Sequence, residues 1–427
     1  MNQSRKEHFA GWIQALGQEI LAESPPPIYM VDDKAYISDI NGGYGQRIRR
    51  LSETMLVEGG WDSKLSAEFV EEEILRQALW EIQESGQTSN TISLLDRLLE
   101  FFDRYDEPRN VYVPLNGVSM TDIHELQFGN VTLMKMTEAQ KEVRAEKLET
   151  EQDRMRFSQE VRVVPHVEVA VSAEPLKARQ IAIDRSREVL DLLRYAVPSL
   201  HPDDPNLFVG ILGEDEFPLL LTAISLGKVE HLFGSFRQVG FTLELSQAAK
   251  ESMENSGVFE LANFLVTEKK TDYELRLIRA LQWFSNSYAQ RDPQNKLLGL
   301  AICLECLLPV PRSAGGTGMW VAEGTAVLLR DNLSERRAIR NKVLGLYRKR
   351  NGIVHGEQSE EIEVSDVDWL TKAVHDLMKA IISRKGDFQD SEGTYIIADW
   401  LQDQRIAPKE GLRHSEDTSA QYERRST

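Results

Sequence analysis

Cysteine is almost missing from this chain: Cys303 and Cys306 are the two cysteines in 427 residues. Two thiols three positions apart cannot build the disulfide framework that stabilises small secreted domains. They do not suggest a zinc site either, because no second pair of ligands accompanies them and the surrounding sequence is an apolar helical run. We therefore expect core cysteines, with no metal and no cofactor.

Long apolar runs are missing as well. The nearly apolar stretch 297–310 is too short to span a bilayer and is interrupted by Glu305. The first residues, MNQSRKEHF, lack the apolar core of a secretory signal peptide. Together with the scarcity of cysteine, these features predict a cytoplasmic protein that does not enter a membrane.

Basic residues are outnumbered, with 50 Lys and Arg against 68 Asp and Glu and a formal net charge of −18. Unselective coating of nucleic acid depends on neutralising phosphates, so this balance argues against it. Positive charge is nevertheless concentrated in residues 330–356, where eight basic residues face only Asp331 and Glu335. This cluster is either a solvated helix face or a surface for an anionic partner.

The length predicts two or three domains. Strand-like runs at 110–115, 127–135 and 161–171 and a possible further strand at 219–224 place a small sheet in the middle of the chain. A long helix is predicted over 176–195, with Pro198 breaking it. The predicted fold is multidomain: a mostly helical region over 1–105, an α+β domain over 106–265, an all-α helical bundle over 266–405 and a disordered tail over 406–427.

The stretch 333–356 organises the predicted bundle. Asp331 or Ser334 can cap a helix there, and Asn351 with Gly352 can end it. Apolar residues recur at helical spacing and form one inward stripe of Ile339, Val343 and Leu346, whose next member is Arg350. An arginine in line with apolar neighbours is expected to meet an anionic partner.

Glu305 is the expected partner of Arg350. It occupies an inward stripe on its own helix, formed by residues 298, 301, 302, 305 and 308. Leaving either charge alone would cost several kcal/mol, so pairing is the economical inference. A purely structural ion pair is one interpretation. His355 favours the other, because arginine, histidine and a carboxylate are also the groups that phosphodiester chemistry needs.

The segment LYRKRNGIVHG resembles the signature of HEPN domains, in which an arginine is followed by a polar residue, three further residues and a histidine. Here these are Arg350, Asn351 and His355. The segments LLGLAICLECLLP and SERRAIRNKVLGLY are similar to the Apea-like branch of that family, and the resemblance covers about 270–385. The segment RYAVPSLH, with Arg194 and His201, fits only the loosest spacing, and we regard it as a decoy.

The resemblance implies a HEPN-like bundle and a metal-independent endoribonuclease. His355 would move protons, Arg350 would stabilise charge on the phosphate, Asn351 would hold the phosphate or the histidine, and Glu305 would steady the arginine. One histidine per chain cannot easily act as base and acid at once, so two bundles are expected to share one cleft in a homodimer. The expected RNA contacts are Arg336, Arg337, Arg340, Arg348 and Lys349.

By resemblance, the biological setting would be prokaryotic anti-phage defence or a toxin–antitoxin pair. An antitoxin or a phage-derived trigger is then the expected partner, acting through the first 265 residues. The alternative is a non-catalytic dimerisation or RNA-binding module in which Arg350 and Glu305 serve only as a structural pair.

Overall fold

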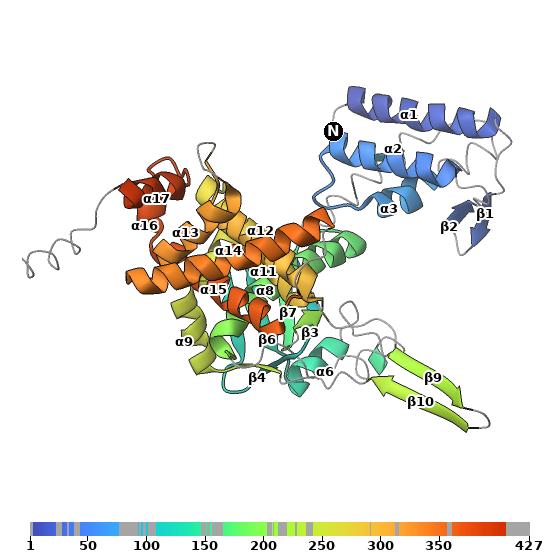
Figure 1. Ribbon diagram of the computed structural model, residues 1–427. Coiled ribbons are helices and arrows are strands. Elements are labelled where there is room, and N and C mark those ends of the chain that lie inside the picture. The colour runs from blue at the N-terminus through green and yellow to red at the C-terminus, as the bar shows by residue number, and fades with distance from the viewer. Residues whose placement is uncertain are drawn as a thin grey trace, which may run out of the picture. The chain divides into compact units, whose positions relative to one another are not determined.

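A computed structural model of the chain describes residues 3–22, 28–31, 34–37, 43–76, 108–146, 165–202, 209–211, 220–226, 229–235, 242–290, 292–311, 316–356 and 361–406, with a few single residues between them. The chain divides into two compact units, Met1–Val113 with Glu168–Arg185 and Pro114–Val167 with Ser186–Thr427 (Figure 1). The domain boundaries expected near residues 105 and 265 stay predictions. The predicted tail beyond residue 406 lies outside the described residues.

The first unit is built on a helical pair with its own core. Its elements are α1 (Gln3–Ala22), β1 (Ile28–Val31), β2 (Lys34–Ile37), α2 (Gly43–Gly59), α3 (Ala67–Val70) and the π-helical turn η1 (Glu71–Leu75). Phe9 and Ile13 of α1 are fully buried, and the Phe9 ring lies 5.5 Å from the ring of Trp61. The apolar face that the helical spacing indicates at the start of the chain therefore packs inward.

Glu174, at the start of α8 (Pro175–Leu200), connects two segments of the first unit. Its carboxylate accepts from the backbone N–H of Leu176 at 2.7 Å and of Lys177 at 2.8 Å, which caps the helix. The same carboxylate accepts from the N–H of Ser66 at 3.2 Å, and the Glu174 N–H donates to the Lys64 carbonyl at 2.9 Å. With 1% exposure, this is a buried carboxylate satisfied by three donors.

The strands form one main sheet and smaller pairs. The strands are β3 (Arg109–Asn116), β4 (Val118–Met120), β5 (Glu125–Phe128), β6 (Val131–Lys135), β7 (Pro165–Val171), β8 (Gly210–Ile211), β9 (Leu220–Leu226), β10 (Val229–Ser235) and β11 (Leu243–Leu245). The five-stranded sheet has the order β5-β6-β7-β3-β8. The described parts of the predicted strand runs are confirmed, and residues 161–164 and 219 lie outside the described residues. The run 127–135 covers the end of β5, the turn and β6, and the register of this hairpin pairs Phe128 with Val131.

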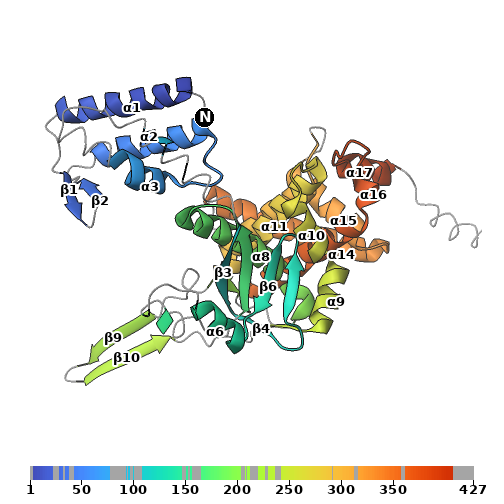
Figure 2. The same cartoon turned by 180° about the vertical axis from the view of Figure 1, so that it is seen from behind.

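The second unit is mostly helical, as predicted for its C-terminal part. Besides the later part of α8, its helices are α6 (Glu138–Glu146, before the sheet strand β7), α9 (Gln247–Ser256), α10 (Val258–Val266), α11 (Asp272–Ala289), α12 (Pro293–Leu307), α13 (Thr317–Leu329), α14 (Leu333–His355), α15 (Val364–Ser383), α16 (Lys385–Phe388) and α17 (Ile397–Ile406). The bundle lies on one face of the sheet, in front of the strands in Figure 1 and behind them in Figure 2. The Phe128 ring of β5 stacks on the Phe259 ring of α10 at 5.7 Å.

Local signals explain the bundle helices. Thr271 and Glu274 form a capping box at the start of α11. Four apolar residues that recur at helical spacing on α15 are buried: Leu370, Val374, Leu377 and Ile381. Among the helices that the structure describes, none combines the length and the apolar character needed to cross a bilayer.

One boundary in this region was predicted wrongly. Pro198 lies inside α8, which continues to Leu200 rather than ending at Tyr195. A proline inside a helix removes one N–H donor and crowds the carbonyl four residues earlier. The residues just before Pro198 are buried, with Tyr195 and Ala196 at 0% and Val197 at 1% exposure, so tertiary packing favours the helix here.

The Glu174 contacts give a first prediction. Replacing Glu174 with Ala leaves three buried backbone donors without their acceptor, so we expect the free energy of unfolding to fall by about 2–4 kcal/mol. Urea denaturation of the full chain, followed by tryptophan fluorescence and circular dichroism, measures the change. Glu254→Ala, at an exposed position of α9, is the matched control and should stay within about 0.5 kcal/mol of the parent. Equal stability of Glu174→Ala and the parent would contradict the capping role.

Candidate functional site

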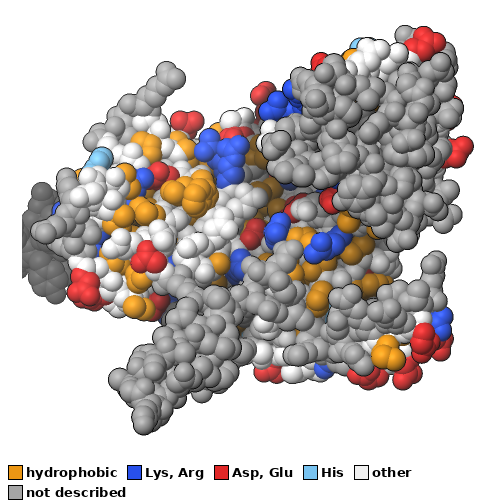
Figure 3. Space-filling view, turned by 90° about the vertical axis from the view of Figure 1, so that its right-hand side faces the viewer, with side chains coloured by type: hydrophobic (Ala, Val, Ile, Leu, Met, Phe, Trp, Pro, Cys, Tyr) orange, Lys and Arg blue, Asp and Glu red, His pale blue; other side chains and the backbone are white. Residues whose placement is uncertain are grey.

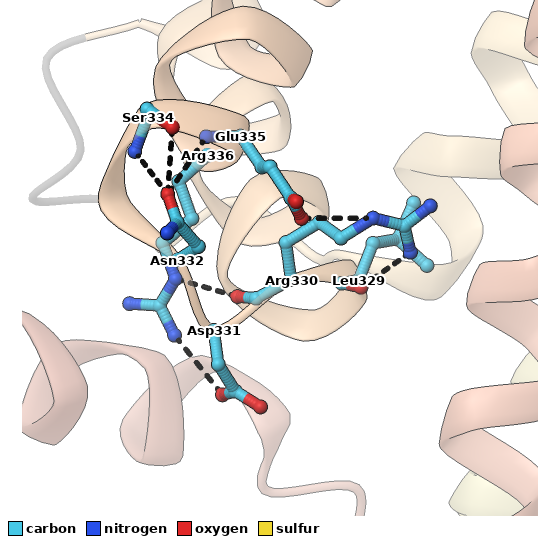
Figure 4. A network of polar contacts seen from close by, with 7 residues as sticks. All are labelled: Leu329, Arg330, Asp331, Asn332, Ser334, Glu335 and Arg336. Atoms are coloured by element: carbon cyan, nitrogen blue, oxygen red, sulfur yellow. Dashed lines mark hydrogen bonds and ion pairs between the residues drawn. The ribbon is translucent and has the colours of Figure 1, made fainter.

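Helix α14 begins at an asparagine cap. The Asn332 side-chain oxygen accepts from the Ser334 N–H at 2.8 Å, from the Ser334 hydroxyl at 2.7 Å and from the Glu335 N–H at 3.4 Å (Figure 4). The cap is therefore Asn332, and the expectation of Asp331 or Ser334 was wrong. Asp331, Asn332 and Ser334 are all good capping residues, so the backbone conformation decides which of them becomes the N-cap.

The end of α14 also differs from the prediction. The helix runs through Asn351 and Gly352 to His355, and it ends at Gly356, whose φ of 67° is left-handed. The Gly356 N–H donates to the carbonyls of Gly352 and Ile353. A glycine ends a helix where it adopts positive φ, and Gly352 instead stays helical and buried.

This longer helix changes the relation between the motif residues. Five residues correspond to about 7.5 Å along the axis and about 140° around it, so Arg350 and His355 project from different sides. Asn351 and His355 are four residues apart and share one face. Both are exposed, and within the described residues the His355 imidazole has no polar partner. Arg350 connects the two sides, because its Nη1 donates to the Asn351 side-chain oxygen at 3.2 Å.

Arg350 meets Glu305 of α12, as the sequence predicts. Arg350 Nη2 lies 3.5 Å from Glu305 Oε1, with side-chain exposures of 25% and 29%. The pair is therefore half-buried rather than buried. Arg350 Nε is buried and has no hydrogen-bond partner among the described residues.

Tyr347 completes this cluster. Its hydroxyl donates at 3.4 Å to Glu305 Oε1 and at 3.3 Å to the Ala301 carbonyl. Burial, followed by the Glu305 carboxylate, raises the pKa of Tyr347, so the phenol keeps its proton. Sequence reasoning missed this residue, although its place three positions before Arg350 on the inward side of α14 was a usable signal.

The five predicted RNA contacts divide into two groups. Three of them have partners within the bundle. Arg336 Nε donates to the Arg330 carbonyl at 2.6 Å. Arg340 Nε lies 3.4 Å from Glu323 Oε1, and Lys349 Nζ lies 2.8 Å from Asp366 Oδ2. Arg337 and Arg348 are exposed and make no ion pair in the part of the chain that the structure describes. At 100° per residue they lie within about 20° of the direction of His355.

We call Arg337, Arg348, Asn351 and His355 the outer stripe of α14. It carries two guanidinium groups, an amide and an imidazole on one exposed side of the helix. On the face drawn in Figure 3, Lys and Arg side chains form separate small groups rather than one continuous patch. This arrangement suits contacts with a few phosphates at defined positions better than unselective binding along a nucleic-acid backbone.

Asp366 of α15 holds the opposite flank of α14. Its side chain is 8% exposed and accepts from Lys349 Nζ at 2.8 Å and from the Lys342 ammonium. Burial acts to raise the pKa of Asp366, but the hydrogen bonds from Lys342 and Lys349 outweigh it and lower the pKa. No signal in the sequence indicated this residue beyond its position in the first turn of a helix.

The groups set aside at the sequence level have structural roles. Arg194 is buried and donates to the Val209 carbonyl at 3.1 and 2.9 Å and to the Ser285 hydroxyl at 3.3 Å. Cys303 is fully buried and donates to the Ala280 carbonyl at 3.1 Å, and burial raises the pKa of its thiol. The expectation of a core cysteine is confirmed for Cys303, while Cys306 is half-buried.

Comparisons with family models, with curated proteins and with solved structures found no match to this chain. The HEPN resemblance therefore stays a prediction, carried by the motif and by the placement of its residues.

The Asp366 contacts give a pH-dependent prediction. Asp366→Asn should lower the free energy of unfolding at pH 7 by about 2 kcal/mol, because two ammonium groups lose their anionic acceptor. The carboxylate has a lowered pKa in the fold, so its stabilisation is present above the ordinary aspartate pKa and is lost as the pH falls through the lowered value. We expect the gap between parent and variant to close on acidification.

Urea titrations at pH 7 and at successively lower pH measure this gap. Asp331→Asn is the control, because Asp331 also faces a basic residue of α14 but is 99% exposed. It should leave the stability unchanged. A gap between Asp366→Asn and the parent that is constant over this range would contradict the assignment.

Proposed function

We propose that the chain is a metal-independent endoribonuclease of HEPN type that acts as a cytoplasmic homodimer. The observation that carries the proposal is the arrangement at the end of α14. Arg350 is oriented by Glu305 and reaches Asn351, and the exposed His355 shares a face with that amide. An arginine fixed beside an accessible imidazole and amide is the set of groups that a phosphodiester needs.

In the proposed reaction, the ribose 2′-hydroxyl attacks the adjacent phosphorus and the bond to the 5′-oxygen breaks. One imidazole accepts the proton of the hydroxyl, and a second imidazole donates a proton to the departing 5′-oxygen. The products are a 2′,3′-cyclic phosphate and a free 5′-hydroxyl. Arg350 stabilises the charge that develops on the phosphate oxygens, and Asn351 holds the phosphate or the imidazole.

The need for two imidazoles supports the homodimer. Each copy contributes one His355, and a two-fold axis beside the outer stripes would bring the second copy to the same phosphate. Arg337 and Arg348 then bind flanking phosphates. The proposed setting is anti-phage defence or a toxin–antitoxin pair, in which an antitoxin or a phage-derived trigger acts through the remainder of the chain.

The alternative is a non-catalytic dimerisation or RNA-binding module. The half-buried Glu305–Arg350–Tyr347 cluster favours it, because these contacts join α12 to α14 irrespective of any reaction. On this interpretation Arg350 is needed for folding and His355 is dispensable.

Cleavage in EDTA separates the two functions. We expect purified protein to cut RNA in EDTA and to leave 2′,3′-cyclic phosphates, and His355→Ala to abolish cleavage with an unchanged melting temperature, because the imidazole is exposed. Arg350→Ala should lower both activity and melting temperature, because it leaves Glu305 without its cation. His124→Ala, another exposed histidine of the same unit, should have no effect. Cleavage that persists in His355→Ala would end the nuclease assignment.

Mixing experiments test the shared cleft. If both imidazoles are needed, equal amounts of parent and His355→Ala protein, allowed to exchange subunits, should retain about a quarter of the parent activity. Independent active sites would retain half. Light scattering on the same samples reports the dimer mass, and a monomer that retains full activity would refute the shared cleft.

A further inference from the structure

A second group of polar side chains lies in the bundle, at a pocket that neither Arg350 nor His355 lines. The pocket has a volume of about 620 Å³ and is bordered by the end of α8, by α9 and by α15. This volume suits a small organic molecule. Its polar lining includes Ser199, Asn255, Lys372, His375, Asp376 and Lys379.

Three of these side chains form a hydrogen-bonded chain. The Ser199 hydroxyl lies 2.9 Å from His375 Nε2, and His375 Nδ1 lies 3.3 Å from a carboxylate oxygen of Asp376. A carboxylate accepts, so the hydrogen-bond network assigns the proton to Nδ1. Nε2 then carries a lone pair and accepts from the serine hydroxyl, which is the protonation pattern that activates a nucleophile.

The imidazole is held rigidly in this orientation. The His375 side chain is 5% exposed, and its ring packs on the Tyr195 ring at a centroid distance of 4.9 Å. Tyr195 is itself fixed, because its buried hydroxyl donates to the Ser256 carbonyl at 2.9 Å. Because packing already fixes the orientation of this base, little conformational entropy is lost when a reaction begins.

The serine occupies an unusual place on its helix. Serine in a helix often donates back to the carbonyl four residues earlier. Ser199 follows Pro198 in the last turn of α8, and its hydroxyl is paired with His375, 176 positions along the chain. Both Ser199 and His375 line the pocket, so a bound molecule can reach the hydroxyl.

We propose that Ser199, His375 and Asp376 form a nucleophilic site that hydrolyses small carboxylic esters. Ser199 Oγ attacks the carbonyl carbon while its proton passes to His375 Nε2. The bond to the alcohol oxygen breaks, and the alcohol leaves with that proton. Water then attacks the acyl-serine and gives one proton to His375, the acid departs, and the proton returns to Ser199. The sum is ester plus water giving acid plus alcohol.

Two ammonium groups and an amide also line the pocket. The ammonium groups of Lys372 and Lys379 and the Asn255 amide are the kinds of group that stabilise a tetrahedral intermediate. Asp376 is 56% exposed and acts by orienting His375, so it is a positioning residue. The proposal does not depend on the ribonuclease assignment, because it shares no residue with the outer stripe.

A fluorophosphonate probe tests the nucleophile directly. We expect the full-length protein to gain the mass of one phosphonyl group, mapped to Ser199 by peptide mass spectrometry. Ser199→Ala should lose the adduct and keep its melting temperature, whereas Ser252→Ala, the matched serine of the same pocket, should be labelled like the parent. No adduct on the parent, or equal labelling of Ser199→Ala and the parent, overturns the proposal.

Ester turnover supplies the second readout. With p-nitrophenyl acetate, Ser199→Ala and His375→Gln should lose at least about 100-fold in kcat/KM, and Asp376→Asn should lose less. If His375→Gln fails to fold, the pair Ser199→Ala and Ser252→Ala still decides the matter. RNA cleavage should be unchanged in Ser199→Ala, so failure of the esterase leaves the nuclease proposal intact. Parent-like turnover by Ser199→Ala refutes the site.

Discussion

The ion pairs on both flanks of α14 are the interactions that position the candidate site. Arg350 meets Glu305 of α12, Lys349 meets Asp366 of α15, and Arg340 meets Glu323 of α13. A half-buried cation loses much of its hydration, and a carboxylate with good geometry compensates for the loss. The basic helix is thus held by acidic partners from three other helices, and these contacts fix its rotation about its own axis.

The same pairing determines which cations remain for a ligand. Three of the five predicted RNA contacts are used within the bundle, and the outer stripe retains Arg337 and Arg348 beside Asn351 and His355. A surface with few available cations on a chain of charge −18 gains little from general attraction to phosphate. For the proposed RNA substrate, recognition would then depend on the positions of these few cations, which suits a structured RNA better than bulk RNA.

Arg350 is paired within the bundle and is also placed to meet a ligand at the end of α14. A guanidinium has five N–H donors, and here one reaches Glu305, one reaches Asn351 and the buried Nε has no partner among the described residues. The carboxylate reduces the local positive charge, but it also fixes the plane of the guanidinium. Fixed orientation lowers the entropic cost of binding a phosphate, which is the benefit expected of a preorganised site.

The sequence predicts features governed by periodicity better than features governed by a single backbone turn. The buried stripe of α15, the strands of the main sheet and the meeting of Arg350 with Glu305 all follow from spacing and from the cost of an unpaired charge. The Asn332 cap, the helical state of Gly352 and the continuation past Pro198 do not, because tertiary packing decides between local alternatives of similar energy. The contacts of Ser199 with His375 join residues 176 positions apart, which no local pattern reveals.

Helix α15 relates the two proposed sites and also separates them. Asp366 and His375 are nine residues apart, which corresponds to about 13.5 Å along the axis and to opposite faces. One face therefore presents a carboxylate to the lysines of α14, and the other presents an imidazole to Ser199 of α8. Sites at this separation with no shared partner usually respond independently to substitution. A single helix can in this way support the proposed nuclease site on one side and the proposed nucleophilic site on the other without coupling their chemistry.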